Sequence, residues 1–151
     1  MRDIEKIIIH CSATIEGKNV SASTIRRWHV KDRGWSDIGY HYVIAIDGEI
    51  VAGRPVHRQG AHTKGENSKS IGICYIGGLS VNKRAKDTRT DAQKNSLVKL
   101  IKILKNKYPG VSIHGHNEFS KKACPCFDVQ KHYAELQPEG YINKNKDDKS
   151  E

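Results

Sequence analysis

The chain has 151 residues, a length that fits one domain with a single hydrophobic core. Hydrophobic residues make up 36% of the chain and glycine adds 13 residues, which excludes a wholly disordered protein. No apolar run approaches the roughly 18 residues that a membrane-spanning helix needs. Asp3 and Glu5 also stand where a secretory signal peptide would carry basic residues. We therefore expect no membrane insertion and no signal peptide.

The chain is basic, with 26 lysines and arginines against 17 aspartates and glutamates and a formal net charge of +9. Such a surplus suits an acidic partner, either nucleic acid or an anionic envelope polymer, although it serves solubility equally well. Aromatic residues make up only 7% and no known nucleic-acid-binding motif is present, so we expect no specific nucleic acid partner. The four cysteines could form two disulfides, but in a reducing cytosol metal binding or catalysis is their more frequent use.

The first quarter of the chain predicts a strand and a helix. Residues 5–13 (EKIIIHCSA) contain a run of β-branched residues, which indicates a buried strand that ends at His10 or Cys11. Residues 21–35 (SASTIRRWHVKDRGW) predict a short helix that ends at Gly34.

The middle of the chain predicts a hairpin and a further strand. Residues 40–54 (YHYVIAIDGEIVAGR) contain two alternating runs joined by Asp47-Gly48, which is the strongest short signal for a hairpin. Residues 70–78 (SIGICYIGG) predict another strand, which a pair of glycines ends.

The clearest helix of the chain lies in residues 90–110 (TDAQKNSLVKLIKILKNKYPG). Thr90 followed by Gln93 fits a capping box, and Pro109-Gly110 ends the helix. Four apolar residues fall on one stripe at i, i+3, i+4 and i+7: Leu97, Leu100, Ile101 and Leu104.

The C-terminal part predicts a strand, a last helix and a tail. Residues 111–116 (VSIHGH) have the pattern of a strand, and Asp128 could cap a helix that runs to Leu136. The charged residues 138–151 have few anchors, so we expect a flexible tail after a single domain of residues 1–137. The order of elements, β-α-β-β-β-α-β-α, predicts an α/β fold with a mixed central β-sheet flanked by helices.

Histidines and cysteines stand at positions where predicted strands end. His10 lies where a buried strand meets a loop, and His114 and His116 lie two apart, on one face of a strand. The pattern alone does not choose between those last two. Two imidazoles and a thiolate from Cys124 or Cys126 would suit Zn²⁺, and three protein ligands would leave a fourth position for water. Against this, the chain has no paired C-x-x-C and no H-E-x-x-H motif.

Four segments, in their order along the chain, resemble one known family. They are IIIHCSAT, DIGYHYVIAIDG, GAHTKGENSKSIGI and GHNEFSKKACPCFD. They look like the zinc-dependent N-acetylmuramoyl-L-alanine amidases, which include small phage lysozymes of the amidase type and share their fold with animal peptidoglycan recognition proteins. The resemblance extends from about residue 5 to residue 136. It implies one zinc ion in an open groove and hydrolysis of the amide between the lactyl group of N-acetylmuramic acid and L-alanine.

The resemblance also implies roles for individual residues. Three would be zinc ligands: His10, His116 and Cys124. Two would be catalytic: Tyr40 and Lys122. Two would lie in a loop that borders the substrate groove: His62 and Asn67.

Without the resemblance, several of these residues would have ordinary interpretations. Tyr40 would be a strand aromatic, and Lys122 would be a solvated loop charge like Lys121 beside it. Glu118 lies close to His116 in sequence, but we expect it to be structural rather than a general base. Three cysteines are expected to take no part in the chemistry: Cys11, Cys74 and Cys126.

Three classes of function are in view. The leading hypothesis is a zinc hydrolase that degrades bacterial peptidoglycan. The alternative is a non-catalytic peptidoglycan-binding module, since some members of this fold lack the cysteine ligand and bind without cutting. This chain keeps all five implied ligands and catalytic residues, which disfavours that alternative. A nucleic-acid-binding protein is suggested by charge alone.

The expected partner and location follow from the family. We expect a monomer whose partner is bacterial peptidoglycan. Without an export signal the chain would be cytoplasmic, as phage endolysins of this family are, and would reach the cell wall only after a holin or lysis opens the membrane. A phage or prophage origin fits this route.

Overall fold

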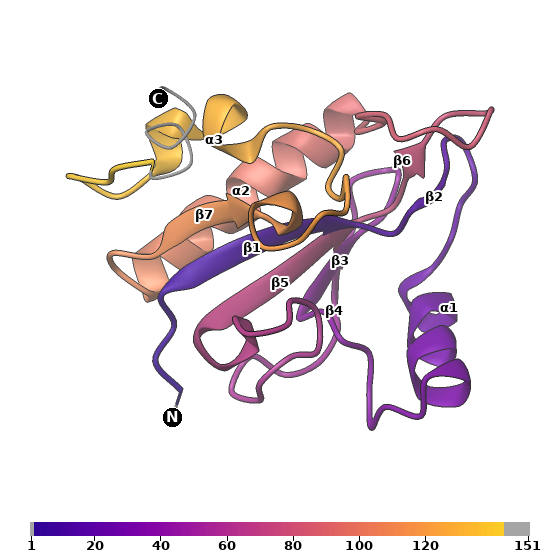
Figure 1. The fold of residues 1–151 in the computed structure, drawn as a ribbon, viewed down its shortest axis with the longest axis horizontal. Helices are drawn as coiled ribbons and strands as arrows, with labels where there is room; N and C mark the ends of the chain where they lie inside the picture. The colour runs from indigo at the N-terminus through magenta and orange to yellow at the C-terminus, as the bar shows by residue number, and fades with distance from the viewer. Residues whose placement is uncertain (1, 144–151) are drawn as a thin grey trace.

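The structure, a computed structural model, describes residues 2–143 and contains a mixed five-stranded sheet flanked by helices (Figure 1). The strands are β1 (Lys6–Cys11), β3 (Tyr42–Ile44), β4 (Ile50–Ala52), β5 (Ser70–Tyr75) and β7 (Ser112–Gly115). Their order in the sheet is β4-β3-β5-β1-β7. β1 is parallel to β5 and β7, β3 is parallel to β5, and β4 is antiparallel to β3. The predicted α/β class with a mixed sheet is confirmed.

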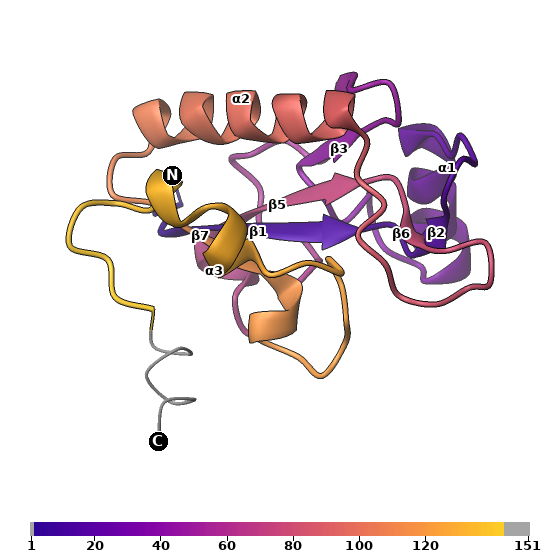
Figure 2. The same cartoon turned by 90° about the horizontal axis from the view of Figure 1, so that it is seen from above.

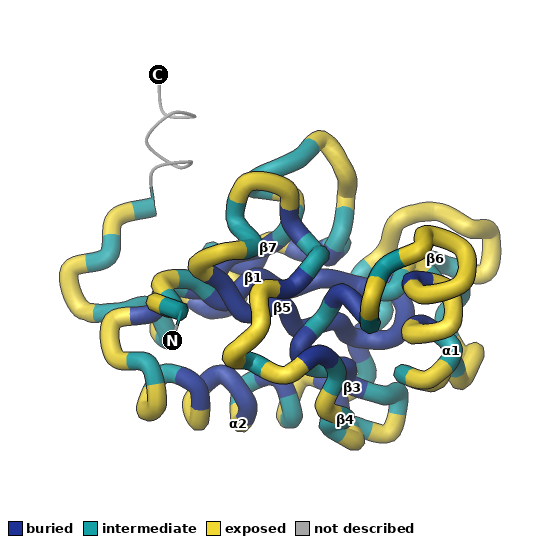
Figure 3. Tube along the Cα trace, turned by 90° about the horizontal axis from the view of Figure 1, so that it is seen from below, coloured by how far each residue is buried: buried dark blue, intermediate teal, exposed yellow. Residues whose placement is uncertain are grey.

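β1 lies between two parallel partners and is buried on both faces. Ile7, Ile8 and Ile9 are all fully buried, which explains why this strand is uninterrupted in its apolar run instead of alternating with polar residues. Figure 3 shows that the neighbouring strand β5 is buried as well. A functional side chain at the end of β1 therefore rests on the most rigid part of the sheet.

The helix α2 (Asp91–Lys107) lies along one face of the sheet (Figure 2). Its predicted capping box is present, and its apolar stripe is buried in the main core. Gln93 is fully buried, and its side-chain amide donates to the backbone oxygens of Ile44 and Ile76, which ties the start of the helix to the sheet. Within residues 2–143, no helix is both long and apolar enough to cross a bilayer.

The predicted short helix and hairpin are both present. α1 (Ala22–Arg27) is capped by Ser21 and continues into a π-helical turn at Trp28–Asp32. The β3–β4 hairpin turns at Gly48, whose φ of +90° is in the left-handed region that glycine adopts freely. A second, two-stranded sheet was not predicted: β2 (Thr14–Ile15) pairs in parallel with β6 (Gly78–Leu79).

The last helix is shorter than predicted. α3 spans only Val129–His132, capped by Asp128 as expected, and a separate 3-10 turn follows at Ala134–Leu136. The break falls at Tyr133, whose φ of −118° leaves the helical region. Tyr133 is buried and its hydroxyl accepts a hydrogen bond from Arg89 at 2.8 Å, so a tertiary contact overrides the local helical pattern.

Residues beyond the last helix cover the free edge of β7. The side-chain amide of Gln137 accepts from the backbone N–H of Ile113 and donates to its carbonyl oxygen, as a neighbouring strand would. The ring of Tyr141 lies 6.0 Å from that of His114. Of the predicted flexible tail, residues 144–151 lie outside the described residues, and the domain boundary at residue 137 stays a prediction.

Candidate metal centre and active site

Two histidines meet at the carboxyl ends of neighbouring parallel strands. His10 is the penultimate residue of β1, and His116 directly follows β7. Because parallel strands end at the same edge of a sheet, the two rings come together, with their centroids 4.6 Å apart. This edge is where α/β sheets commonly place functional side chains.

Cys124 completes a group that could bind a metal. One ligand atom from each of His10, His116 and Cys124 lies within 4.8 Å of the others. The Cys124 Sγ lies 3.9 Å from Nδ1 of His10 and accepts the backbone N–H of Cys11 at 3.2 Å. The loop that carries Cys124 is anchored from below, because the buried Tyr75 hydroxyl donates to the carbonyl oxygen of Pro125 at 2.6 Å.

The other nitrogen of His10 is held by two side chains. Nε2 lies 2.9 Å from Nδ1 of His62 and 3.1 Å from the hydroxyl of Thr63. These contacts leave Nδ1 turned toward Cys124 and fix the orientation of the ring. Burial lowers the pKa of His10 well below its usual range, and the neighbouring His62 lowers it further, so the imidazole is neutral at pH 7.

The loop of residues 61–67 is shaped by Asn67. Its side-chain oxygen accepts the backbone N–H groups of His62 at 3.0 Å and Thr63 at 2.9 Å. The ring of His62 in turn lies against β5 at Gly72, where an added Cβ would come within 2.6 Å of it. In this structure both His62 and Asn67 position the residues behind His10, and their predicted contact with substrate stays a prediction.

Tyr40 packs directly on the metal group. Its ring centroid lies 5.1 Å from that of His10 and 5.5 Å from that of His29. His29 is itself fixed, because its Nδ1 accepts the backbone N–H of Gly39 at 2.9 Å. Burial raises the pKa of Tyr40 well above its usual range, so the phenol stays protonated near neutral pH and can donate a hydrogen bond or a proton.

Lys122 brings a positive charge to the same place. Burial is the main cause that lowers the pKa of His116, and the charge of Lys122 is the second. The same charge contributes to the lowered pKa of His10. The lysine lies on the exposed part of the loop that also carries Cys124. All five residues predicted as ligands or catalytic groups are therefore gathered at one edge of the sheet.

The comparison with known families decides which class of protein this is. A family model described as N-acetylmuramoyl-L-alanine amidase matches residues 1–127. The chain belongs to this amidase family. Its activity is the hydrolysis of the amide bond in peptidoglycan from which the family takes its name.

Curated relatives and solved structures agree with the family. The amidase is 42% identical over 127 residues to the endolysin of Escherichia phage T7, a match that covers 84% of this chain and 83% of that one. The endolysin of Enterobacteria phage T3 matches equally well, at 42% identity with the same coverage.

Two solved structures extend the likeness to the fold. The N-acetylmuramoyl-L-alanine amidase LysC from Clostridium intestinale superposes with a TM-score of 0.76 at 31% identity, over 91% of this chain and 88% of that one. Bumblebee PGRP-SA superposes with a TM-score of 0.73 at 31% identity, over 89% and 85% of the two chains.

His114 and Glu118 of the amidase form hydrogen bonds that support the turn before His116. His114 lies further back along β7, with its Nδ1 2.9 Å from a carboxylate oxygen of Glu118. The other oxygen of Glu118 accepts the backbone N–H of Gly115 at 2.7 Å, and Gln130 donates to both oxygens. The carboxylate thus holds the turn at His116, and the expectation that Glu118 is not the general base stays a prediction.

Sequence patterns missed several residues that shape the site. Thr63 holds His10, the N–H of Cys11 holds the Cys124 sulfur, and Tyr75 anchors the loop through Pro125. Each acts on a residue at least 50 positions away in the chain, so no local motif announces it. Cys11 and Cys74 are both buried.

Buried neutral histidines should make the metal-free amidase sensitive to acid. Burial is the largest cause that lowers the pKa of His29 and His41 to about 4 and that of His62 to about 3. In the unfolded chain the pKa of each of these rings is about 6.5. The unfolded state therefore binds more protons below that pH, and stability that is fully present above it is lost as the pH falls. We expect the Tm of the metal-free amidase to decrease as the pH is lowered from about 6.5 to about 5, before most carboxylates titrate. A constant Tm over that pH range would contradict the lowered pKa values of these histidines.

Proposed function

We propose that the amidase is a zinc enzyme that cleaves the amide between the lactyl group of N-acetylmuramic acid and L-alanine. The observation that carries the proposal is the convergence of the ligand atoms of His10, His116 and Cys124 within 4.8 Å of one another. Two imidazoles and one thiolate are donors that zinc favours, and three protein ligands leave one coordination position for reaction.

The surroundings of the three donors fit this ion. The imidazole of His10 is neutral, which is the form that binds metal, and its second nitrogen is occupied by Thr63 and His62. The sulfur of Cys124 accepts the backbone N–H of Cys11, which holds it in place beside His10. Zinc bound here would supply Lewis acidity, which lowers the pKa of water towards about 7 and polarises an amide carbonyl.

Two side chains supply the remaining chemistry. Attack on the amide places negative charge on the carbonyl oxygen, and the departing amine of L-alanine needs a proton. The protonated phenol of Tyr40 and the ammonium group of Lys122 are the donors beside the ligands. We assign them to these two tasks, since donors aimed at a developing oxyanion lower the barrier most effectively in a site with little water.

The remaining parts of the proposal concern substrate, assembly and release. His62 and Asn67 belong to the loop proposed to border the peptidoglycan groove, and their hydrogen bonds keep that loop in place. The three donors come from one chain, which supports action as a monomer. The relatives from phages T7 and T3 are endolysins, so we propose that the amidase reaches the wall from inside the cell after the membrane is opened.

Removal of the metal tests the proposal most directly. The amidase should lose nearly all activity after dialysis against a chelator and regain it with one equivalent of zinc per chain. The measurements are metal content and the release of new amino groups from purified peptidoglycan, with the new N-terminal residue identified as L-alanine. Full activity in a metal-free sample would refute the zinc proposal, and a different N-terminal residue would refute the proposed bond.

Two neighbouring lysines offer a matched test of the catalytic assignment. Lys122→Met should lower kcat by about 100-fold to 1,000-fold, because it removes a donor to the oxyanion or the leaving amine. Lys121→Met removes an equal charge one residue away and should change kcat by less than about threefold. Equal losses in the two variants would show that only general electrostatic attraction to the wall had been removed. Zinc content should stay unchanged in both.

A further inference from the structure

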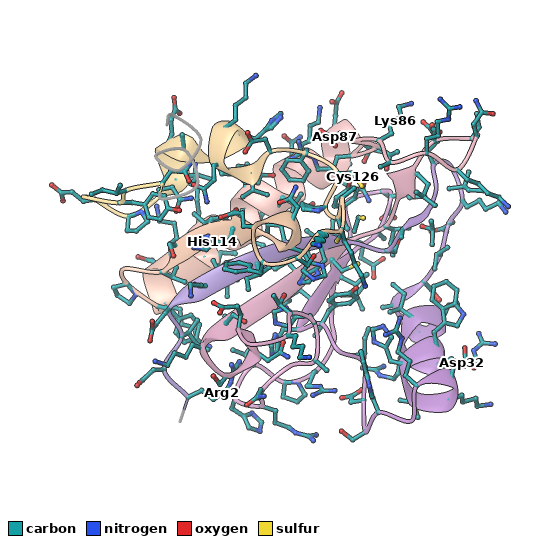
Figure 4. The ribbon with its side chains drawn as sticks, viewed as in Figure 1. Arg2, Asp32, Lys86, Asp87, His114 and Cys126 are labelled. Carbon is teal, nitrogen blue, oxygen red and sulfur yellow. The ribbon has the colours of Figure 1, made fainter. Side chains whose placement is uncertain are left out.

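A second sulfur contact lies next to the metal group and takes no part in it. The Sγ atoms of Cys11 and Cys126 are 3.8 Å apart. Cys11 follows His10 on β1, and because strand side chains alternate, it points to the opposite face from His10. Figure 4 labels Cys126 on the loop that carries Cys124, where this loop passes the end of β1. The two thiols thus make a contact between β1, which carries His10, and the loop that carries Cys124.

The backbone at Cys126 is held in a strained conformation. Its φ is +70°, in the left-handed region that a non-glycine residue adopts only at a cost. The loop holds this conformation through the Cys126 N–H, which donates to the Ala123 carbonyl at 2.7 Å, and through the Tyr75 hydroxyl on Pro125. A glycine would relieve the strain, but it would lose the sulfur that faces Cys11.

We propose that Cys11 and Cys126 are a disulfide-forming pair, which a small-molecule disulfide such as oxidised glutathione can oxidise while Cys124 remains a ligand. Bonded sulfurs lie about 2.05 Å apart, so each needs to move by only about 1 Å from the present contact. Of the other cysteines, Cys124 also contacts Cys11, but its sulfur is taken up by the proposed zinc site. Cys74 is fully buried with its thiol turned to the backbone of Tyr75, and a bridge between Cys124 and Cys126 across one residue would be strained.

The reaction is a double thiol–disulfide exchange. Cys126, which is partly exposed, attacks one sulfur of oxidised glutathione and releases the first glutathione thiol. Cys11 then attacks the Cys126 sulfur of the mixed disulfide and releases the second. The two protein thiols lose two electrons and two protons, and the oxidant gains them as two thiols.

The two cysteines are 115 residues apart in the chain. The bridge would join β1 to the loop across most of the chain, which restricts the unfolded state strongly.

The test uses the zinc-loaded amidase in buffers of increasing oxidised-to-reduced glutathione ratio. We expect the chain to lose two hydrogen masses, and peptide mapping after alkylation to show Cys11 linked to Cys126 with Cys74 and Cys124 alkylated. Zinc content should be unchanged, and Tm should rise by roughly 5–10 °C. Cys126→Ser and Cys11→Ser should each abolish both the mass loss and the rise in Tm.

Three results would overturn the proposal. They are a glutathione adduct that stays on Cys126, a link between Cys124 and Cys126 with release of zinc, and four free thiols at every ratio. None of them bears on the zinc-dependent activity, because activity and metal content of the reduced amidase are measured separately.

Discussion

Cys124→Ala is expected to abolish metal binding and amidase activity together. The substitution removes the only sulfur within reach of both histidines in the described part of the chain, and two imidazoles alone hold zinc weakly. We expect less than about one-hundredth of the zinc affinity, since even loss of an indirect contact to a metal ligand costs about 10-fold to 100-fold. Competition with a chromophoric chelator measures the affinity, and amino-group release from peptidoglycan measures the activity.

Cys126→Ser is the matched control, two residues away on the same loop. Its sulfur contacts Cys11 and not the histidines, so zinc affinity and kcat should stay within about threefold of the parent. If this variant loses zinc and Cys124→Ala retains it, the two cysteines have the opposite roles. Both variants should be compared under reducing conditions, so that no disulfide contributes to the difference.

Tyr40→Phe is expected to lower kcat by about 100-fold to 1,000-fold with little change in zinc content. The ring would still pack on His10, so only the hydroxyl is lost. Because burial raises the pKa of Tyr40, the phenol should remain a donor well into the alkaline range, and its ionisation should not limit the rate near pH 8. Single-turnover rates against pH, for both proteins, measure this.

Tyr42→Phe is the control for that experiment. Tyr42 lies two residues further along, on β3, and packs against the main core with α2 rather than against the metal group. Its kcat should be unchanged within about threefold. A normal kcat in Tyr40→Phe would remove the tyrosine from the chemistry and leave Lys122 as the donor.

Local patterns predicted most of the sheet and α2, because hydrophobic periodicity and caps are properties of neighbouring residues. The capping box at Thr90 and the turn at Gly48 are present as expected. The break at Tyr133 was missed because it depends on Arg89, a partner 44 residues away. The two-residue strands β2 and β6 were missed because they are too short to show any period.

The candidate site was likewise predictable only where it depends on local patterns. The predicted strand ends indicated that His10 and His116 lie near one edge of the sheet. The strand pattern could not choose between His114 and His116, and that choice came from the resemblance to the amidases. The structure supplies the physical reason: Glu118 engages His114, and the ring of His116 lies beside that of His10. The contacts that orient the ligands, such as Thr63 with His10, appear only when distant segments fold together.

The side chain of Gln137, which pairs with Ile113 on β7, changes what counts as the smallest working unit. The family match ends at residue 127, ten residues before this contact. A protein that ends at residue 127 would keep every proposed ligand. Its strand β7 would, however, have an uncovered edge that can pair with the edge of another molecule. A chimeric lysin that uses this catalytic domain should therefore include the chain through residue 137, because this segment covers the edge of β7 and so opposes aggregation.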